Sequence, residues 1–320
     1  MMLYDLPAPA KLNLFLHVVG RRQDGYHLLE SLFRLISLSD SISVDLRLDG
    51  VISREWHGET GADLDVNPDS DLVVRAARLL QQHTRCQLGA HLSVVKRIPL
   101  GGGLGGGSSD AATTLLALNH LWRTGLGRDQ LISLGLKLGA DVPFFLLGQS
   151  AFVQGIGEIM QPVELPQASY LVLKPSIGIP TAAIFASSDL TRNTESVKIS
   201  DFSGRAFFVS GGANGSGTIP SLAGFGKNDL ERVAIQLYPE VSSALQWADD
   251  HGLAVRMSGS GSCFFAEFET PEKAELARKS LVSRISTDSF EVNGSAESAI
   301  ELVGVCDGLQ EHPLRHWAKD

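Results

Sequence analysis

A run of glycines between residues 101 and 107 constrains this chain more than any other feature of its sequence. Residues 98–110 read Ile-Pro-Leu-Gly-Gly-Gly-Leu-Gly-Gly-Gly-Ser-Ser-Asp, with six glycines in seven positions. Glycine adopts positive φ without steric cost, so such a run lets backbone N–H groups converge on one anion. A strand-like segment, 91–96, precedes the run, and a helix-like segment follows it from Ala111 to Trp122. Because a helix N-terminus adds partial positive charge, the pattern predicts a phosphate-binding loop.

Three other interpretations of the loop carry less weight. A flexible linker is disfavoured because the run is short, lies between apolar segments and contains Leu104. The spacing over Gly101–Gly106 matches the dinucleotide fingerprint G-x-G-x-x-G, which is a weak signal by itself. The acidic residue that the fingerprint requires would be Asp129, which follows a turn and not a strand. A Walker A loop is excluded because Ser108–Asp110 stands where Lys-Ser/Thr is required. The kind of phosphate ligand stays open at this point.

Composition limits the class of protein. A chain of 320 residues with 43% hydrophobic content can bury a large core, and its length suggests two domains. No apolar run approaches the 18 residues of a membrane span, and the start has no basic-then-apolar leader, so we expect a cytoplasmic protein. Cys86, Cys263 and Cys306 are too dispersed to build a metal site or a disulfide framework. A net charge of −9 argues against a nucleic-acid surface.

Hydrophobic periodicity predicts strands and helices in both halves of the chain. We expect a domain boundary near 155–165, a mobile Gly/Ser-rich loop at 203–226, a plain hairpin turn at 258–262 and an uninformative polar tail at 308–320. The expected strands are 11–19, 28–38, 41–48, 91–96, 150–153, 170–174, 253–257 and 263–268, and the expected helices besides 111–122 are 71–80, 130–138, 181–185, 230–238, 242–249 and 272–282.

Several polar positions stand out in these elements. Lys11 and Asn13 share one face of the first strand, where a solvated sheet face and a functional site fit the pattern equally well. Pro143 is tolerated only in the first turn of a helix, so Asp141 is expected to be the N-cap residue there. Ser70 or Asp71 is the expected N-cap of the helix over 71–80.

Three separated segments resemble the motifs of the GHMP small-molecule kinases: Pro9–Leu14, Pro99–Ala112 and Met257–Ser262. The resemblance extends from about Pro9 to about Phe268, with 203–226 as an insertion. Further segments are similar to the branch of that superfamily that acts on methylerythritol linked to cytidine diphosphate, namely Gly25–His27, Leu138–Phe144 and Ile179–Thr181.

The resemblance implies an α+β fold of two domains with the active site in the cleft between them. Residues 1–160 would form an N-terminal ATP-binding domain, and residues 161–320 a C-terminal ferredoxin-like domain on the substrate side. The implied reaction transfers the γ-phosphate of ATP, accompanied by Mg²⁺, to the 2-hydroxyl of diphosphocytidyl methylerythritol in the non-mevalonate pathway to isoprenoids. The implied partner is this small molecule, with neither nucleic acid nor membrane, and the oligomeric state stays open.

The resemblance also assigns roles to matching positions. Asp141 would be the general base and Lys11 its electrostatic partner. Tyr26 and Phe185 would enclose the cytosine, and His27 would hydrogen-bond it. The substrate pocket would further be lined by Asn13, Pro180 and Thr181. ATP would be held by the loop residues Pro99, Leu100, Gly101, Gly102, Gly103, Leu104, Gly105, Gly106, Gly107, Ser108 and Ser109.

Two acidic residues complicate these roles. Asp110 would repel a triphosphate unless Mg²⁺ or an outward rotamer intervened, and Ser108 or Ser109 could approach that metal, although no ligand set can be named. Asp71 stands where the family usually has Asn, near the expected adenine side, so the contacts to the purine are in doubt.

Other functions remain to be separated from this one. The substrate of a mevalonate or homoserine kinase of the same superfamily carries no base that could stack on Tyr26 and His27. A dinucleotide-dependent oxidoreductase would use Gly101–Gly106 instead, and a non-catalytic nucleotide-binding protein would not need both Lys11 and Asp141.

Overall fold

A computed structural model describes residues 2–58, 67, 69–197, 226–285, 290–292, 295–297 and 300–320. The expected loop at 203–226 lies outside the described residues except for Gly226. The described elements, in chain order, are β1 (Met2–Arg21), β2 (His27–Arg47), β3 (Ile52–Gly58), α1 (Leu72–Thr84), β4 (Gly89–Lys96), α2 (Gly106–Leu121), α3 (Arg128–Gly135), α4 (Val142–Leu147), β5 (Ala151–Gly155), β6 (Ile159–Pro162), β7 (Ser169–Pro175), α5 (Thr181–Ala186), α6 (Glu231–Leu237), α7 (Pro239–Asp250), β8 (Arg256–Met257), β9 (Phe264–Phe268), α8 (Pro271–Ile285), β10 (Phe290–Val292), β11 (Ser295–Glu297), β12 (Ile300–Asp307) and the 3₁₀ helix η2 (Arg315–Trp317).

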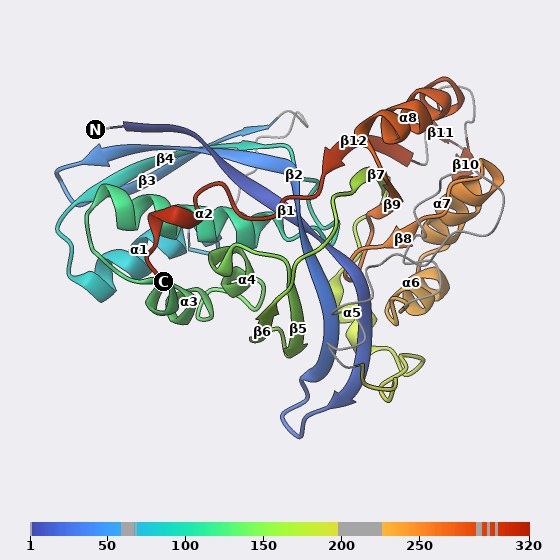
Figure 1. Cartoon of the computed structure of the whole chain (residues 1–320), viewed down its shortest axis with the longest axis horizontal. Helices are drawn as coiled ribbons and strands as arrows, with labels where there is room; N and C mark the ends of the chain where they lie inside the picture. Colours follow the sequence, from blue (N-terminus) through green and yellow to red (C-terminus); the bar gives the residue numbers. More distant parts are fainter. Residues whose placement is uncertain are drawn as a thin grey trace.

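A long antiparallel hairpin of β1 and β2 organises the N-terminal half (Figure 1). Along its other edge β2 pairs first with β5, over residues 29–33, and then with β4, over residues 41–47. The resulting sheet has the order β3-β4-β2-β5-β6, with β1 against β2. Helices α1 to α4 pack on one side of this sheet, and Figure 1 shows α2 at their centre.

The C-terminal half contains an antiparallel sheet of order β12-β7-β9-β8. Numbered by their order in the chain, these strands read 4-1-3-2, with helices between the first and second strands and between the third and fourth. This is the βαββαβ arrangement of a ferredoxin-like domain, as expected.

A shared core joins the two halves. Leu12 and Leu32 of the hairpin, Leu104 of the glycine loop, and Tyr170 and Phe265 of the C-terminal sheet belong to one buried apolar cluster. Burial of this surface stabilises the contact by about 25 cal/mol per Å² of apolar area. The glycine loop is therefore held between two sheets that come from different halves of the chain.

Several sequence-based boundaries are wrong, for identifiable reasons. The helix after the glycine loop begins at Gly106 and not at Ala111. Gly105 is its N-cap residue, and Gly106 and Gly107 already form its first turn. The strands expected at 28–38 and 41–48 are one continuous strand, β2, in which polar Ser39–Ser41 pairs with β1. Strand β3 was not expected because its edge position leaves it without apolar alternation.

The tail at 308–320 is also more informative than expected. Leu314 and Ala318 belong to the core beneath the N-terminal sheet, and the backbone N–H of His312 donates to the carbonyl of Gly148. The guanidinium of Arg128 donates to carbonyls of Arg315 and Ala318. The chain thus returns from the C-terminal sheet to the N-terminal half. None of the described helices is long and apolar enough to cross a membrane.

Candidate active site

Two hollows meet at the glycine loop. The larger, of about 360 Å³, is lined from both halves of the chain, by residues that include Lys11, Asp141, Thr181 and Phe185. The second hollow, of about 240 Å³, is lined by the loop itself and by the start of α2. Gly103, Gly105 and Ser108 line both hollows. A group lying across the loop could therefore reach from one hollow to the other.

The second hollow contains the residues expected to hold a triphosphate. Every position from Pro99 to Ser108 lines it, whereas Ser109 does not. The hydroxyl of Ser109 donates to the carbonyl of Pro9 at 2.6 Å and is fully buried, so it fastens α2 to β1. The first N–H groups of α2 have no partners inside the helix, and an anion in this hollow would lie close to them.

Residues 258–262 do more than form the expected plain hairpin turn. The N–H groups of Ser262 and Cys263 donate to the carbonyls of Gly101 and Gly102, both at 3.2 Å. The hydroxyl of Ser258 donates to the carbonyl of Gly103 at 3.1 Å and accepts from the N–H of Asn13, also at 3.1 Å. This second Gly/Ser turn therefore fixes the shape of the glycine loop from the C-terminal half.

Glycine is required in the loop because of these close contacts. Gly103 has φ +73, and a Cβ there would lie 2.1 Å from the carbonyl oxygen of Ser258. At Gly102 a Cβ would lie 2.4 Å from the Sγ of Cys263. Any side chain at these positions would push the two turns apart.

Lys11 and Asp141 lie together in the larger hollow. The Lys11 Nζ is 3.7 Å from an Asp141 carboxylate oxygen, donates to the Asn13 side-chain oxygen and lies 4.7 Å from the centre of the Phe33 ring. Only 5% of the Lys11 side chain is exposed, against 33% for Asp141. Burial lowers the pKa of Lys11, and the neighbouring charge of Asp141 opposes that shift. Lys11 and Asn13 thus lie on a buried face of β1 and not on a solvated one.

Asp141 occupies the N-cap position of α4 without capping it. Its side chain makes no hydrogen bond to the first turn of the helix, and Pro143 removes one of the donors that a cap would satisfy. A carboxylate that is partly exposed, close to an ammonium group and free of a capping bond can accept a proton from a ligand in the hollow.

Phe185 lines the larger hollow and packs against His27 beside it. The rings of His27 and Phe185 have centres 5.0 Å apart and are tilted by 32°. Phe185 lines the hollow, whereas His27 and Tyr26 do not, and Tyr26 is 61% exposed. The start of β2 and helix α5, which lie far apart in the sequence, therefore meet here.

Of the other expected substrate residues, Asn13 and Thr181 line the same hollow and Pro180 does not. Asn13 lines it and donates from its side-chain amide to the hydroxyl of Ser31 at 2.9 Å. Thr181 lines it too, with its hydroxyl 2.7 Å from that of Ser260 in the second Gly/Ser turn. Pro180 is exposed and precedes the first turn of α5.

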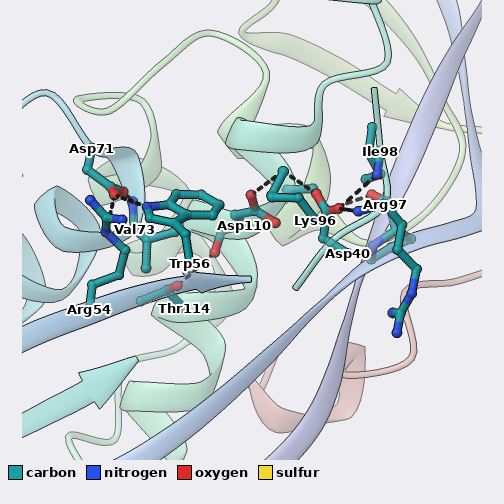
Figure 2. A network of polar contacts seen from close by, with 12 residues as sticks. Asp40, Arg54, Trp56, Asp71, Val73, Lys96, Arg97, Ile98, Asp110 and Thr114 are labelled. Carbon is teal, nitrogen blue, oxygen red and sulfur yellow. Dashed lines mark hydrogen bonds and ion pairs between the residues drawn. The ribbon is translucent and has the colours of Figure 1, made fainter. Parts of the chain in front are cut away.

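Beneath the glycine loop lies a buried ionic network, shown in Figure 2. The Lys96 ammonium contacts the carboxylates of Asp40 and Asp110, the latter at 2.7 Å. The second carboxylate oxygen of Asp40 accepts from the N–H groups of Arg97 and Ile98 at 2.6 and 2.8 Å. Asp110 is fully buried and lines neither hollow, so its carboxylate is turned away from the expected triphosphate, as one of the two alternatives required.

Asp71 is likewise a structural residue. It caps α1 by accepting from the N–H of Val73 at 2.8 Å, as expected. It also pairs with Arg54 at 2.5 Å and accepts from the Trp56 indole at 3.1 Å, as Figure 2 shows. Buried in this way, the carboxylate of Asp71 is not exposed to a purine.

The residues present suit a metal that arrives with its ligand. Within the described part of the chain no group of three or more His, Cys, Asp or Glu side chains could hold a metal. Mg²⁺ commonly keeps its waters and uses substrate phosphates with one or two protein ligands. Of the two serines expected near such an ion, only Ser108 lines the hollows, since the hydroxyl of Ser109 is buried against Pro9.

Comparison with known proteins decides the family. Residues 71–149 match the family model "GHMP kinases N terminal domain", and residues 218–286 match "GHMP kinases C terminal". A curated protein of Bordetella bronchiseptica named 4-diphosphocytidyl-2-C-methyl-D-erythritol kinase is 53% identical, covering 99% of each chain. One of the same name from Aromatoleum aromaticum is 51% identical, covering 98% of this chain and 96% of its own.

This chain belongs to the 4-diphosphocytidyl-2-C-methyl-D-erythritol kinase family. As a member of that family it is an ATP-dependent small-molecule kinase. A crystal structure of 4-(cytidine 5'-diphospho)-2C-methyl-D-erythritol kinase is 34% identical, with a TM-score of 0.66, and covers 97% of this chain and 100% of its own. A homoserine kinase structure from Cytophaga hutchinsonii has a TM-score of 0.65 at 15% identity over 97% of this chain and 95% of its own, which shows a shared fold.

Some residues of this kinase's site were missed in the sequence. Lys96 had a usable signal, because a lysine ending a buried strand just before an anion-binding loop is unusual. The residues next to Asp40, Arg192 and Asn228 in the sequence give no pattern that would mark these three as functional. Asn228 donates to the carbonyls of Met257 and Gly259 and so shapes the second Gly/Ser turn.

Proposed function

We propose that Asp141 and Lys11 carry the phosphoryl transfer and that the two hollows separate the substrates. The reaction is the ATP-dependent phosphorylation of the 2-hydroxyl of 4-diphosphocytidyl-2-C-methyl-D-erythritol. ATP would occupy the loop-lined hollow, and the cytidyl substrate would occupy the larger one. The observation that carries the assignment is that Lys11 and Asp141 line the larger hollow, which meets the phosphate loop at Gly103, Gly105 and Ser108.

The chemistry of this arrangement follows from charge. An alkyl hydroxyl is a poor nucleophile at neutral pH, and the Asp141 carboxylate would accept its proton as the phosphoryl group transfers. The Lys11 ammonium, 3.7 Å from that carboxylate, would offset charge on the phosphoryl oxygens as they transfer. Mg²⁺ bound with the triphosphate would neutralise part of its charge, with Ser108 as the protein hydroxyl within reach.

An ADP-release assay tests the reaction directly. The kinase should release ADP with the cytidyl substrate, and should release none above background with mevalonate or homoserine. Asp141→Asn should stop release while ATP still binds in calorimetry. Faster release with mevalonate or homoserine than with the cytidyl substrate would overturn the substrate assignment.

The base-binding end of the cleft has its own test. If Tyr26 closes over the cytosine, Tyr26→Ala should weaken substrate binding by about 1–3 kcal/mol, the range of aromatic–base stacking. Tyr26→Phe is the matched control and should be nearly silent, because it keeps the ring face. The loss should appear in the KM for the cytidyl substrate; a rise in the KM for ATP would reverse the assignment of the two hollows.

A further inference from the structure

Arg192 is held rigidly against the side chains at the base-binding end of the cleft. Its Nη2 donates to the carbonyls of Phe185 and Ser187 at 3.3 and 2.6 Å, and its Nη1 donates to the carbonyl of Leu190 at 3.0 Å. Its Nε donates to Nε2 of His27 at 3.0 Å. Three carbonyls from the end of α5 and the following turn thus fix the guanidinium so that its Nε–H points at one imidazole nitrogen.

This contact decides which nitrogen of His27 carries a proton. A guanidinium can only donate hydrogen bonds, so Nε2 of His27 must accept and must be unprotonated. Burial lowers the pKa of His27, and the positive charges of Arg192 and Arg21 lower it further. The imidazole is therefore neutral, and its single proton is on Nδ1.

The remaining polar atom of the ring is then a hydrogen-bond donor. The His27 ring lies 5.0 Å from that of Phe185, which lines the larger hollow. Nδ1–H is the atom of His27 that Arg192 does not engage, and it is available to a base that stacks at Phe185. Cytosine has an acceptor at N3, whereas uracil has an N–H there.

We propose that Arg192 is a positioning residue that selects cytosine over uracil by holding His27 as the Nδ1–H tautomer. A cytosine N3 would accept from Nδ1–H, but a uracil would bring two donors together and leave both unpaired. The inference rests on the proposed function only in placing the base beside His27 and Phe185.

The test combines a spectroscopic measurement with a selectivity ratio. Nitrogen-15 NMR of labelled protein should show His27 neutral with the proton on Nδ1. Arg192→Met should abolish that signature, and the preference for the cytidyl substrate over its uridyl analogue, as a ratio of kcat/KM, should fall about tenfold, the equivalent of one hydrogen bond. The change should come through KM for the cytidyl substrate, with KM for ATP unchanged.

Two further variants separate positioning from structural support. Arg21→Met removes a nearby cation that donates to the carbonyl of Gly25 and not to His27. It should raise the pKa of His27 without altering the tautomer or the ratio. Arg192→Lys keeps a charge and a donor and should restore part of the ratio. If Arg192 merely supported α5, Arg192→Met would weaken binding of the cytidyl and uridyl substrates equally and leave the ratio unchanged. That result would overturn the proposal.

His27→Ala distinguishes this failure from failure of the proposed function. If His27→Ala leaves KM for the cytidyl substrate unchanged, the base does not lie there and the substrate assignment itself is wrong. If His27→Ala raises that KM but Arg192→Met changes neither tautomer nor ratio, the substrate assignment stands and the role of Arg192 is wrong.

Discussion

Two lysines, Lys11 and Lys96, lie against the glycine loop near Gly105 and Gly106, and their surroundings differ in kind. Lys11 is 3.7 Å from one partly exposed carboxylate, and burial lowers its pKa. Lys96 contacts two fully buried carboxylates, Asp40 and Asp110. Burial acts to lower the pKa of Lys96, but the attraction of these two carboxylates prevails and raises it.

The difference shows how one residue type supports either chemistry or structure. Lys96 is enclosed by two buried acids, and its contacts with Asp40 and Asp110 fix the strand end, the loop start and α2 to one another. A lysine with one loosely placed partner keeps unneutralised charge that a ligand can use. The two ammonium groups therefore differ in burial and in the number of acidic partners, although Lys96 also lines the hollow of the glycine loop.

Asp141→Asn should produce the largest effect of the set. Loss of the proton acceptor should lower kcat by about 10²–10⁴-fold, while the melting temperature hardly changes because the side chain makes no capping bond. Steady-state kinetics with a thermal melt checks both. Turnover near that of the unaltered enzyme would mean that Asp141 merely fills the N-cap position.

Exchanging each lysine for methionine tests the comparison itself. Lys96→Met would leave Asp40 and Asp110 facing each other without a cation, and should lower the free energy of unfolding by about 3–5 kcal/mol. Lys11→Met is the matched control and should lower activity with little loss of stability, because it removes a charge that burial penalises. Urea unfolding and ADP release measure both. Equal losses of stability in the two variants would refute the division between them.

Asp110→Asn should change how stability depends on pH. Burial raises the pKa of Asp110 to about 8, nearby Asp40 adds to the shift and Lys96 opposes it, whereas the unfolded chain has an ordinary value near 3.8. The folded state therefore binds an extra proton between about pH 4 and 8. The contribution of Asp110 to the free energy of unfolding is fully present below pH 4, falls as the pH rises, and is lost once the pH passes 8.

Removing the carboxylate should remove that slope, at most about 1.4 kcal/mol per pH unit. The stability of Asp110→Asn relative to the unaltered enzyme should therefore increase from pH 4 to pH 8 in urea titrations. Asp129→Asn, an exposed acid in the first turn of α3, is the control and should show a flat difference. A flat difference for Asp110→Asn as well would place its proton elsewhere in the network.

Gly103→Ala should give the smallest effect of the set, a rise in KM for ATP of about tenfold. The added Cβ meets the carbonyl of Ser258 at 2.1 Å, and the positive φ costs about 1–2 kcal/mol for any other residue. Gly107→Ala is the control, because its Cβ would meet only Leu72, at 3.6 Å. Unchanged ATP affinity in calorimetry of Gly103→Ala would remove the phosphate-binding interpretation of the loop.

Local patterns accounted for much of the fold. Alternation over 11–19 indicated a strand, and the residues around Asp71 indicated the cap of α1. Element ends were less predictable, since Gly106–Asp110 is helical only because α2 is packed against β1 and fastened there by Ser109. Intrinsic propensity at glycine opposes that start, and tertiary contacts override it.

The candidate site divides in the same way. The glycine loop and the motif around Asp141 were visible in sequence because their chemistry depends on residues that are neighbours in the chain. The contacts of Lys96 with Asp40, of Arg192 with His27 and of Ser258 with Gly103 join residues separated by 56, 165 and 155 positions. No periodicity spans such distances.

The sequence by itself predicted that an anion would be held by glycine backbone, because only glycine tolerates the required φ values and close approach. It also identified the family, through three motifs that the chain keeps far apart. Only the tertiary structure decided which charges are free to act. The pKa of each lysine depends on burial and on how many carboxylates surround it, and those are properties of packing between distant strands and helices.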